Sequence, residues 1–201
     1  MTDLRHPIAA GLAGLSLFAL AGCPGKGGSG PPIQSASEIS PDALYGKAAN
    51  LNYGGTAIAV TMERIAKGPT IEFTLSAHGQ VLETETYRLE PAFFALVSID
   101  EVFEPPLPLL KFPMQVGDEW TWEGRLKMGS LDHPAKARVE TREEKLVVGR
   151  RDPFTLRVDA VLEIESGASS PAKRQLTFWF ERGHGIVKRE IGTATVREPK
   201  D

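Results

Sequence analysis

The sequence predicts a mainly β protein: a single curved antiparallel sheet, or open half-barrel, of about nine or ten strands, with at most one short N-terminal helix. Three observations predict it. From Thr56 onwards apolar and polar residues alternate with a period of two, which is typical of strands with one buried and one solvated face. Short turn signals rich in glycine and proline separate these stretches. No second segment shows a long helical repeat.

The first half of the predicted sheet contains four alternating or apolar stretches. Ile58, Val60 and Met62 share one face of the first strand. Residues 71–77 alternate clearly, and turns at 67–69 and 78–79 enclose them. Residues 81–89 alternate less cleanly. Residues 93–102 are apolar on both faces, which predicts a more buried strand.

The second half contains the longest alternation in the chain. Residues 120–128 place Trp120, Trp122, Leu126 and Met128 on one face. A strand begins near Ala137 and continues or restarts at residues 145–148. Residues 154–164 then alternate without interruption, and residues 176–180 and 186–191 follow on either side of a Gly-His-Gly turn. We expect an antiparallel sheet with short connections.

The N-terminal part has a different composition. Ser40 suits the N-cap and Pro41 the first helical position of a short helix that runs to about Asn50. Residues 23–37 are rich in glycine, serine and proline, which predicts a flexible tether. We therefore assign residues 23–37 to a tether and residues 38–201 to the β domain.

The first residues match a bacterial secretion signal. Arg5 is followed by an uncharged apolar stretch of about 14 residues, short of the roughly 20 that span a bilayer. The stretch ends in Leu20-Ala21-Gly22-Cys23, which resembles the lipobox of bacterial lipoproteins. That resemblance implies cleavage between Gly22 and Cys23, a diacylglycerol on the Cys23 thiol and an acylated amino group. Residues 1–22 are then the signal peptide, and residues 23–37 are a lipidated tether.

Cys23 is the only cysteine in the chain. A disulfide within one chain and a cysteine-based zinc site are therefore excluded, and lipidation explains the residue well. One acyl chain binds a membrane only marginally, whereas two or three hold a domain durably. Pro24 follows the cysteine in place of the aspartate that retains enterobacterial lipoproteins in the inner membrane. We expect a periplasm-facing protein in the cell envelope, at the outer rather than the inner membrane.

Composition and motifs argue against several classes of function. The formal net charge is −3 and the cations are dispersed, so no nucleic-acid partner is expected. His78, His133 and His184 lie apart at or beside predicted turns, without metal-ligand spacing. No nucleophile elbow occurs, and we interpret the carboxylates on the strands as the solvated face of the sheet. We expect no cofactor, no metal and no enzymatic activity.

Large aromatic residues are the candidates for a binding face. Trp120, Trp122 and Phe178 are predicted to point to the inner side of the sheet, where they form either an apolar ligand face or, as we favour, plain core. Trp179 points the opposite way from Phe178 and Phe180. It is either exposed for a partner or covered by the N-terminal segment.

Three motifs in order resemble the bacterial envelope proteins of the DUF3108/TapB-like group. They are the proline-rich segment 104–113 that runs into 114–122, the strand pair 144–148 and 154–158, and residues 177–188. The turn at 149–153 departs from the Pro-Ala-Gly-Thr turn usual in that group. The group is largely of unknown function. Its sheets look like the curved half-barrels of periplasmic lipoprotein carriers, which implies a similar architecture here.

Four functions are compatible with these observations. The first is a non-catalytic, lipid-anchored envelope protein whose curved sheet binds a protein partner or an apolar ligand. The second is a periplasmic carrier of an apolar molecule or lipid. The third is an uncatalogued envelope hydrolase that uses carboxylates, and the fourth is a structural spacer or assembly subunit. The first is our leading hypothesis.

Overall fold

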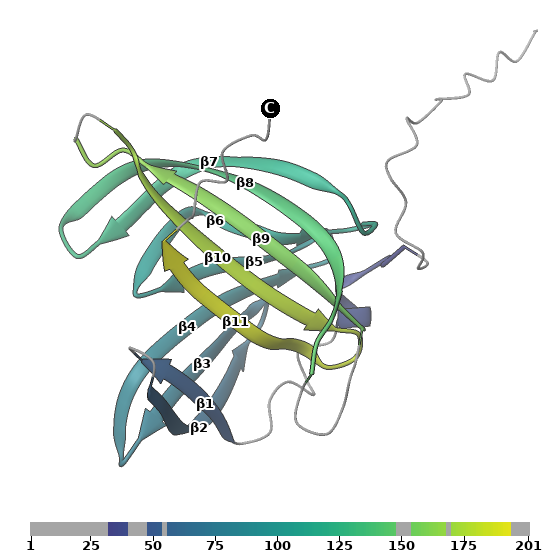
Figure 1. Ribbon diagram of the computed structural model, residues 1–201, viewed down its shortest axis with the longest axis horizontal. Coiled ribbons are helices and arrows are strands. Elements are labelled where there is room, and N and C mark those ends of the chain that lie inside the picture. Colours follow the sequence, from purple (N-terminus) through teal and green to yellow (C-terminus); the bar gives the residue numbers. More distant parts are fainter. Residues whose placement is uncertain (1–31, 40–47, 54–55, 148–153, 168–169, 194–201) are drawn as a thin grey trace, which may run out of the picture.

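The structure, a computed structural model, describes residues 32–39, 48–53, 56–147, 154–167 and 170–193. These residues form one antiparallel sheet of eleven strands that follow one another in chain order (Figure 1). The strands are β1 (Ala48–Tyr53), β2 (Thr56–Lys67), β3 (Thr70–Ala77), β4 (Gln80–Glu90), β5 (Phe93–Ile99), β6 (Glu101–Lys111), β7 (Glu119–Met128), β8 (Leu131–Lys145), β9 (Phe154–Ile164), β10 (Ala172–Glu181) and β11 (Gly185–Thr193). The predicted fold class is confirmed: the chain is mainly β, and its sheet is curled into a half-barrel.

Two strands were not predicted. β1 covers residues 48–50, which we had assigned to the end of a helix, and this assignment is wrong because Ala48–Tyr53 pairs with Thr56–Thr61 of β2. The rest of that predicted helix, residues 40–47, lies outside the described residues. The only helical turn that the structure describes is the 3₁₀ turn η1 (Ala36–Ile39). β6 is the second unpredicted strand, because prolines interrupt its pattern.

The prolines of β6 split the sheet locally. β6 pairs with β5 along its length, but with β7 only at Val102, Phe103 and Glu104. Pro105, Pro106 and Pro108 have no N–H group to donate to β7, so the ladder cannot continue. We call β1–β6 the first wing and β7–β11 the second wing of the half-barrel.

Tight turns keep the other strands in register. His78 and Gly79, which connect β3 and β4, both have positive φ angles of 51° and 77°. That combination gives the type I′ turn whose twist matches a two-residue hairpin. The turn predicted at these residues is therefore confirmed, and it fixes which face of β4 points inward.

The sheet curls so that β9–β11 lie over β4–β6 (Figure 1). The inner faces of the two wings meet there in one hydrophobic core, which includes Phe73, Leu96, Leu126, Val158 and Phe180. Among the described strands, β1 and β11 are the two edges of the sheet, since no ladder joins them. We call the line where the inner faces of β4–β6 meet those of β10 and β11 the seam.

Candidate functional site

Aromatic rings fill the middle of the seam. Tyr87 of β4 stacks on Phe94 of β5 with ring centroids 5.2 Å apart, and Phe94 meets Phe180 of β10 edge-on at 5.8 Å. Phe178, predicted for a ligand face, lies beside Phe180 at 6.3 Å and is fully buried. Edge-on and offset pairs of this kind add to the free energy of core burial. Phe178 is therefore a buried neighbour of Phe180, the ring that joins β10 to β5 across the seam.

Trp120 and Trp122 lie elsewhere, at the split between β6 and β7. The Trp122 indole N–H donates to the Pro105 carbonyl over 3.1 Å, and the Trp120 N–H donates to the Pro108 carbonyl over 3.0 Å. The two indoles thus bond to β6 where the ladder to β7 is missing. Trp122 is buried against Phe103, and Trp120 is half-buried under the Lys111 ammonium. The structure does not bring the two tryptophans and Phe178 into one pocket, and a ligand face at these residues stays a prediction.

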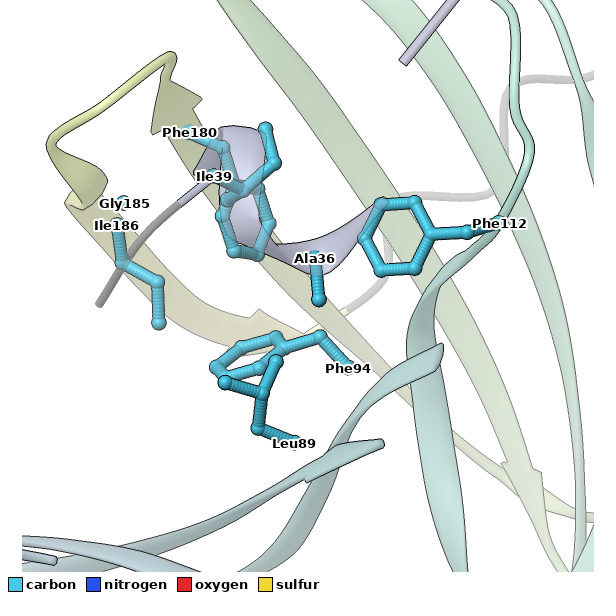
Figure 2. A pocket seen from close by; sticks show the side chains of 8 residues that line it. All are labelled: Ala36, Ile39, Leu89, Phe94, Phe112, Phe180, Gly185 and Ile186. Carbon is cyan, nitrogen blue, oxygen red and sulfur yellow. The ribbon is translucent and has the colours of Figure 1, made fainter. Parts of the chain in front are cut away.

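An apolar pocket lies at one end of the seam (Figure 2). Leu89 and Phe94 form one wall, Phe180 and Ile186 another, and the Phe112 ring points in from the end of β6. η1 covers the pocket with Ala36 and Ile39, which face these side chains. As it stands, the pocket has room for about one water molecule.

The N-terminal segment, residues 33–39, closes this end of the half-barrel. Ile33 and Met114 exchange two backbone hydrogen bonds of 2.9 Å, and the Gly183 N–H donates to the Glu38 carbonyl over 2.9 Å. The Glu38 carboxylate lies 3.7 Å from the Arg182 guanidinium. Ile33 and Ile39 are both buried. Residues 33–37, predicted as part of the tether, therefore contact the β domain.

Charged side chains occupy the other end of the seam. Arg189 of β11 donates from Nε to Glu85 of β4 over 2.8 Å and also pairs with Glu83. The Tyr87 hydroxyl donates to the second Glu85 oxygen. Glu85 is only 4% exposed, and each of its two carboxylate oxygens accepts a hydrogen bond from one of these partners. We call Glu83, Glu85, Tyr87 and Arg189 the ionic cluster.

The ionic cluster has more acid than base. One guanidinium faces two carboxylates, and Asp100 adds a third negative charge nearby. Burial, opposed by Arg189 and reinforced by the charge of Glu85, raises the pKa of Glu83 to about 7. A second ion pair between Arg174 of β10 and the buried Glu101 of β6 also crosses the seam.

Trp179 is on the outer face but is not exposed. Only 2% of it is accessible, because the Arg157 guanidinium and the Lys188 ammonium lie over its ring at 5.0 and 4.4 Å from the centroid. The interpretation of Trp179 as an exposed residue was therefore wrong, since side chains of β9 and β11 lie over its ring. Its cover by the N-terminal segment stays a prediction, because most of that segment lies outside the described residues. Arg157 also binds Asp159 through two nitrogen atoms, and Asp159 accepts from Thr177 over 2.8 Å.

The described residues contain no group of three histidine, aspartate or glutamate side chains that could hold a metal ion. In that same part of the chain, no helix is long and apolar enough to cross a membrane. Gly22 and Cys23, the predicted cleavage and lipidation residues, lie outside the described residues, so both assignments stay predictions.

Comparisons with known proteins give no relative. No family model, no curated protein and no solved structure matches the chain. The resemblance to the DUF3108/TapB-like group therefore stays a prediction, and the function has to be argued from the molecule itself.

Neither the pocket nor the ionic cluster was predicted from the sequence. The pocket residues come from η1, β4, β5, β10 and β11 and from the end of β6, so no local pattern unites them. The sequence does contain one signal for the cluster. Glu83, Glu85 and Tyr87 are spaced two residues apart, and residues two apart lie on the same face of a strand. That signal says which residues lie together, but not that their face is the buried one.

Proposed function

We propose that the chain is a non-catalytic lipoprotein of the bacterial cell envelope, anchored through lipid on Cys23, whose half-barrel binds a protein partner or an apolar ligand. One observation carries the proposal: residues 33–39, which include the end of the predicted tether, are docked at one end of the half-barrel. Cys23 and Ile33 are separated by about ten residues, which span at most roughly 35 Å when extended. The pocket end of the domain would therefore stay close to the lipid surface.

The inner face supports a binding role over a catalytic one. Its middle is filled by core side chains, and the raised pKa of Glu83 belongs to a carboxylate held by Arg189 rather than one that lines the pocket. A perturbed carboxylate becomes a catalytic candidate where a substrate can reach it. In the described part of the chain the pocket lies at the opposite end of the seam.

Intact mass after expression in a bacterial host tests the anchor. Wild type should begin at Cys23 and carry diacylglycerol and acyl mass, whereas Cys23→Ala should lack both. Membrane fractionation should find wild type in the outer-membrane fraction. An unlipidated wild-type chain, or one cut elsewhere, would refute the anchored protein. Turnover by the purified domain in a broad hydrolase screen would refute the non-catalytic role.

A carrier of an apolar molecule is the second candidate. The pocket favours it, because all of its lining side chains are apolar and it lies at the end next to the predicted tether. Organic extraction of protein purified without detergent should then release a co-purifying lipid. The carrier role would be lost if the extract is empty and added fatty acid leaves the tryptophan fluorescence unchanged.

A further inference from the structure

The N-terminal segment has the chemical character of a ligand. It places two apolar side chains, Ala36 and Ile39, over the pocket (Figure 2). Its carboxylate, that of Glu38, lies 3.7 Å from Arg182, in the turn between β10 and β11. An apolar body with one anionic group is the general form of a fatty acid or an acidic phospholipid. The pocket walls that it covers consist of aliphatic and aromatic side chains.

The segment is also attached differently from the rest of the domain. Each strand of the sheet is held by a ladder of backbone bonds to its neighbours. By contrast, the backbone of the segment is joined to the sheet and its loops by the two bonds to Met114 and the bond from Gly183. The Glu38–Arg182 ion pair and the burial of three apolar side chains, Ile33, Ala36 and Ile39, add to this attachment. A short segment with few backbone hydrogen bonds to its neighbours can open at a lower free energy than the global unfolding of the domain.

We propose that residues 33–39 form a displaceable plug over a binding site for one fatty acyl chain with an anionic head. The acyl chain takes the place of Ala36 and Ile39 between Leu89, Phe94, Phe112, Phe180 and Ile186. This inference rests on the proposed binding function, and it names the ligand class and the element that gates access.

Charge complementarity places the anionic head of the ligand at Arg182. When the plug leaves, the Glu38 carboxylate leaves with it, and the Arg182 guanidinium stays at the turn between β10 and β11. Guanidinium groups bind carboxylates and phosphates by charge-assisted hydrogen bonds. The ligand head therefore replaces Glu38 as the acyl chain replaces Ile39, and neither site is left uncovered.

A reversible crosslink tests the plug. Ile33 and Met114 exchange two backbone hydrogen bonds, and the Cα atoms of such a pair are about 5.5 Å apart, within the range of a disulfide. The variant Ile33→Cys/Met114→Cys is made in the full chain with Cys23→Ser, so that only one disulfide can form. Binding of cis-parinaric acid, a fluorescent fatty acid, is titrated in the oxidised and the reduced form.

We expect the reduced form to bind the probe saturably, as Cys23→Ser alone does, and the oxidised form to bind at least about tenfold more weakly, since the locked state excludes the ligand. Equal affinity of the two forms, or no saturable binding by the Cys23→Ser chain, would overturn the proposal. Circular dichroism of both forms establishes that the variant is folded. An acidic phospholipid and a free fatty acid are then compared as competitors, to distinguish the two sources of an acyl chain.

The head site has its own variant. Arg182→Glu should lower the affinity for the fatty acid about tenfold relative to that for its methyl ester, because the loosened plug affects both ligands but only the acid carries the charge. Arg138→Glu is the matched control, since Arg138 is another exposed arginine paired with a glutamate. If Arg182→Glu weakens the acid and the ester equally, Arg182 does not bind the head. Failure of lipidation in the mass measurement would refute the anchor alone, because the binding titration uses an unlipidated chain.

Discussion

Arg189 on β11 contacts Glu85 on β4 with 2.8 Å between Nε and Oε1, although 104 positions separate them in the chain. No backbone ladder joins the two strands, so this contact holds the open side of the half-barrel through side chains alone. The seam therefore has three parts: the plug and pocket at one end, the aromatic rings in the middle and the ionic cluster at the other end.

Removing the Arg189 guanidinium should lower the free energy of unfolding more than removing the guanidinium of an exposed arginine. Arg189→Met leaves Glu83 and Glu85 buried without their guanidinium, and breaking a buried pair in this way costs about 3–5 kcal/mol in the free energy of unfolding. Urea denaturation measures it. Glu83→Gln/Glu85→Gln/Arg189→Met should recover most of the loss, because no unpaired charge is left.

The control for this prediction is Arg138→Met. Arg138 pairs with Glu119 over 2.8 Å, but its side chain is 61% exposed, so the urea midpoint should hardly move. A midpoint of Arg189→Met that equals that of Arg138→Met would mean that the ionic cluster does not hold the seam.

The ionic cluster should also make stability depend on pH. Because burial raises the pKa of Glu83 from 4.5 to about 7, the native state binds more protons than the unfolded chain between these values. Stability from this group is therefore present at low pH and falls as the pH rises from about 4.5 to about 7. Unfolding midpoints of wild type and Glu83→Gln should coincide near the lower limit and diverge above it, with wild type the less stable.

Glu123→Gln serves as the comparison, since Glu123 is exposed and pairs with Lys136 over 3.5 Å. It should follow the wild-type pH profile. A wild-type profile that runs parallel to that of Glu83→Gln would show that Glu83 titrates normally.

Asp159 should show the opposite pH dependence. Burial raises its pKa, but hydrogen bonds from Arg157 and Thr177 outweigh burial and hold the pKa below 3.8. Stability from this group is therefore present above about 3.8 and is lost as the pH falls through the folded-state pKa. Asp159→Asn should be about 1.5–3 kcal/mol less stable at neutral pH, the usual value of a hydrogen bond to a charged group.

The difference between wild type and Asp159→Asn should shrink in acid, where the native carboxylate takes up its proton. Asp132→Asn is the matched control, because Asp132 also accepts from an arginine, Arg125, but is largely exposed. Asp132→Asn should leave the midpoint of thermal unfolding nearly unchanged at both neutral and acidic pH. A difference for Asp159→Asn that is constant with pH would contradict the lowered pKa.

Strands could be predicted from the sequence where apolar and polar residues alternate regularly, because such a pattern indicates one face turned to the core. Residues 154–164 became β9 as predicted, because apolar side chains on one face and polar side chains on the other alternate without a break. β6 was not predicted, because three prolines interrupt its alternation of apolar and polar residues. It forms a strand nevertheless, since β5 pairs with it. β1 was missed because a proline and an apparent N-cap favoured a helix, and the ladder with β2 outweighed that local preference.

The site was harder to predict than the sheet, because it depends on how far the sheet curls. Alternation shows that Glu83 and Tyr87 share a face, but only the curl brings Arg189 to them. For the same reason Phe178 could be placed on the inner face, whereas its contact with Phe180 and the exclusion of Trp120 from the pocket could not be foreseen.

The last prediction concerns the split between β6 and β7. Gly124 lies under the Trp122 indole, and a Cβ atom there would lie 2.7 Å from the Glu104 carbonyl oxygen and closer still to the ring. Gly124→Ala must therefore displace the indole and break its hydrogen bond to Pro105. Overpacking of this kind costs about 1–3 kcal/mol. The loss should appear in urea unfolding followed by tryptophan fluorescence, with a native spectrum shifted to longer wavelength because Trp122 gains contact with water.

Gly192→Ala separates this steric effect from the general effect of adding a methyl group to a strand. Gly192 is also a strand glycine, but nothing lies within 4 Å of its added Cβ atom. Alanine is favoured over glycine within strands by about 0.5–1 kcal/mol, so Gly192→Ala should be as stable as wild type or slightly more stable. If Gly124→Ala behaved in the same way, the indole would have to move without cost. Trp122 would then not be what joins β7 to β6 beyond Glu104.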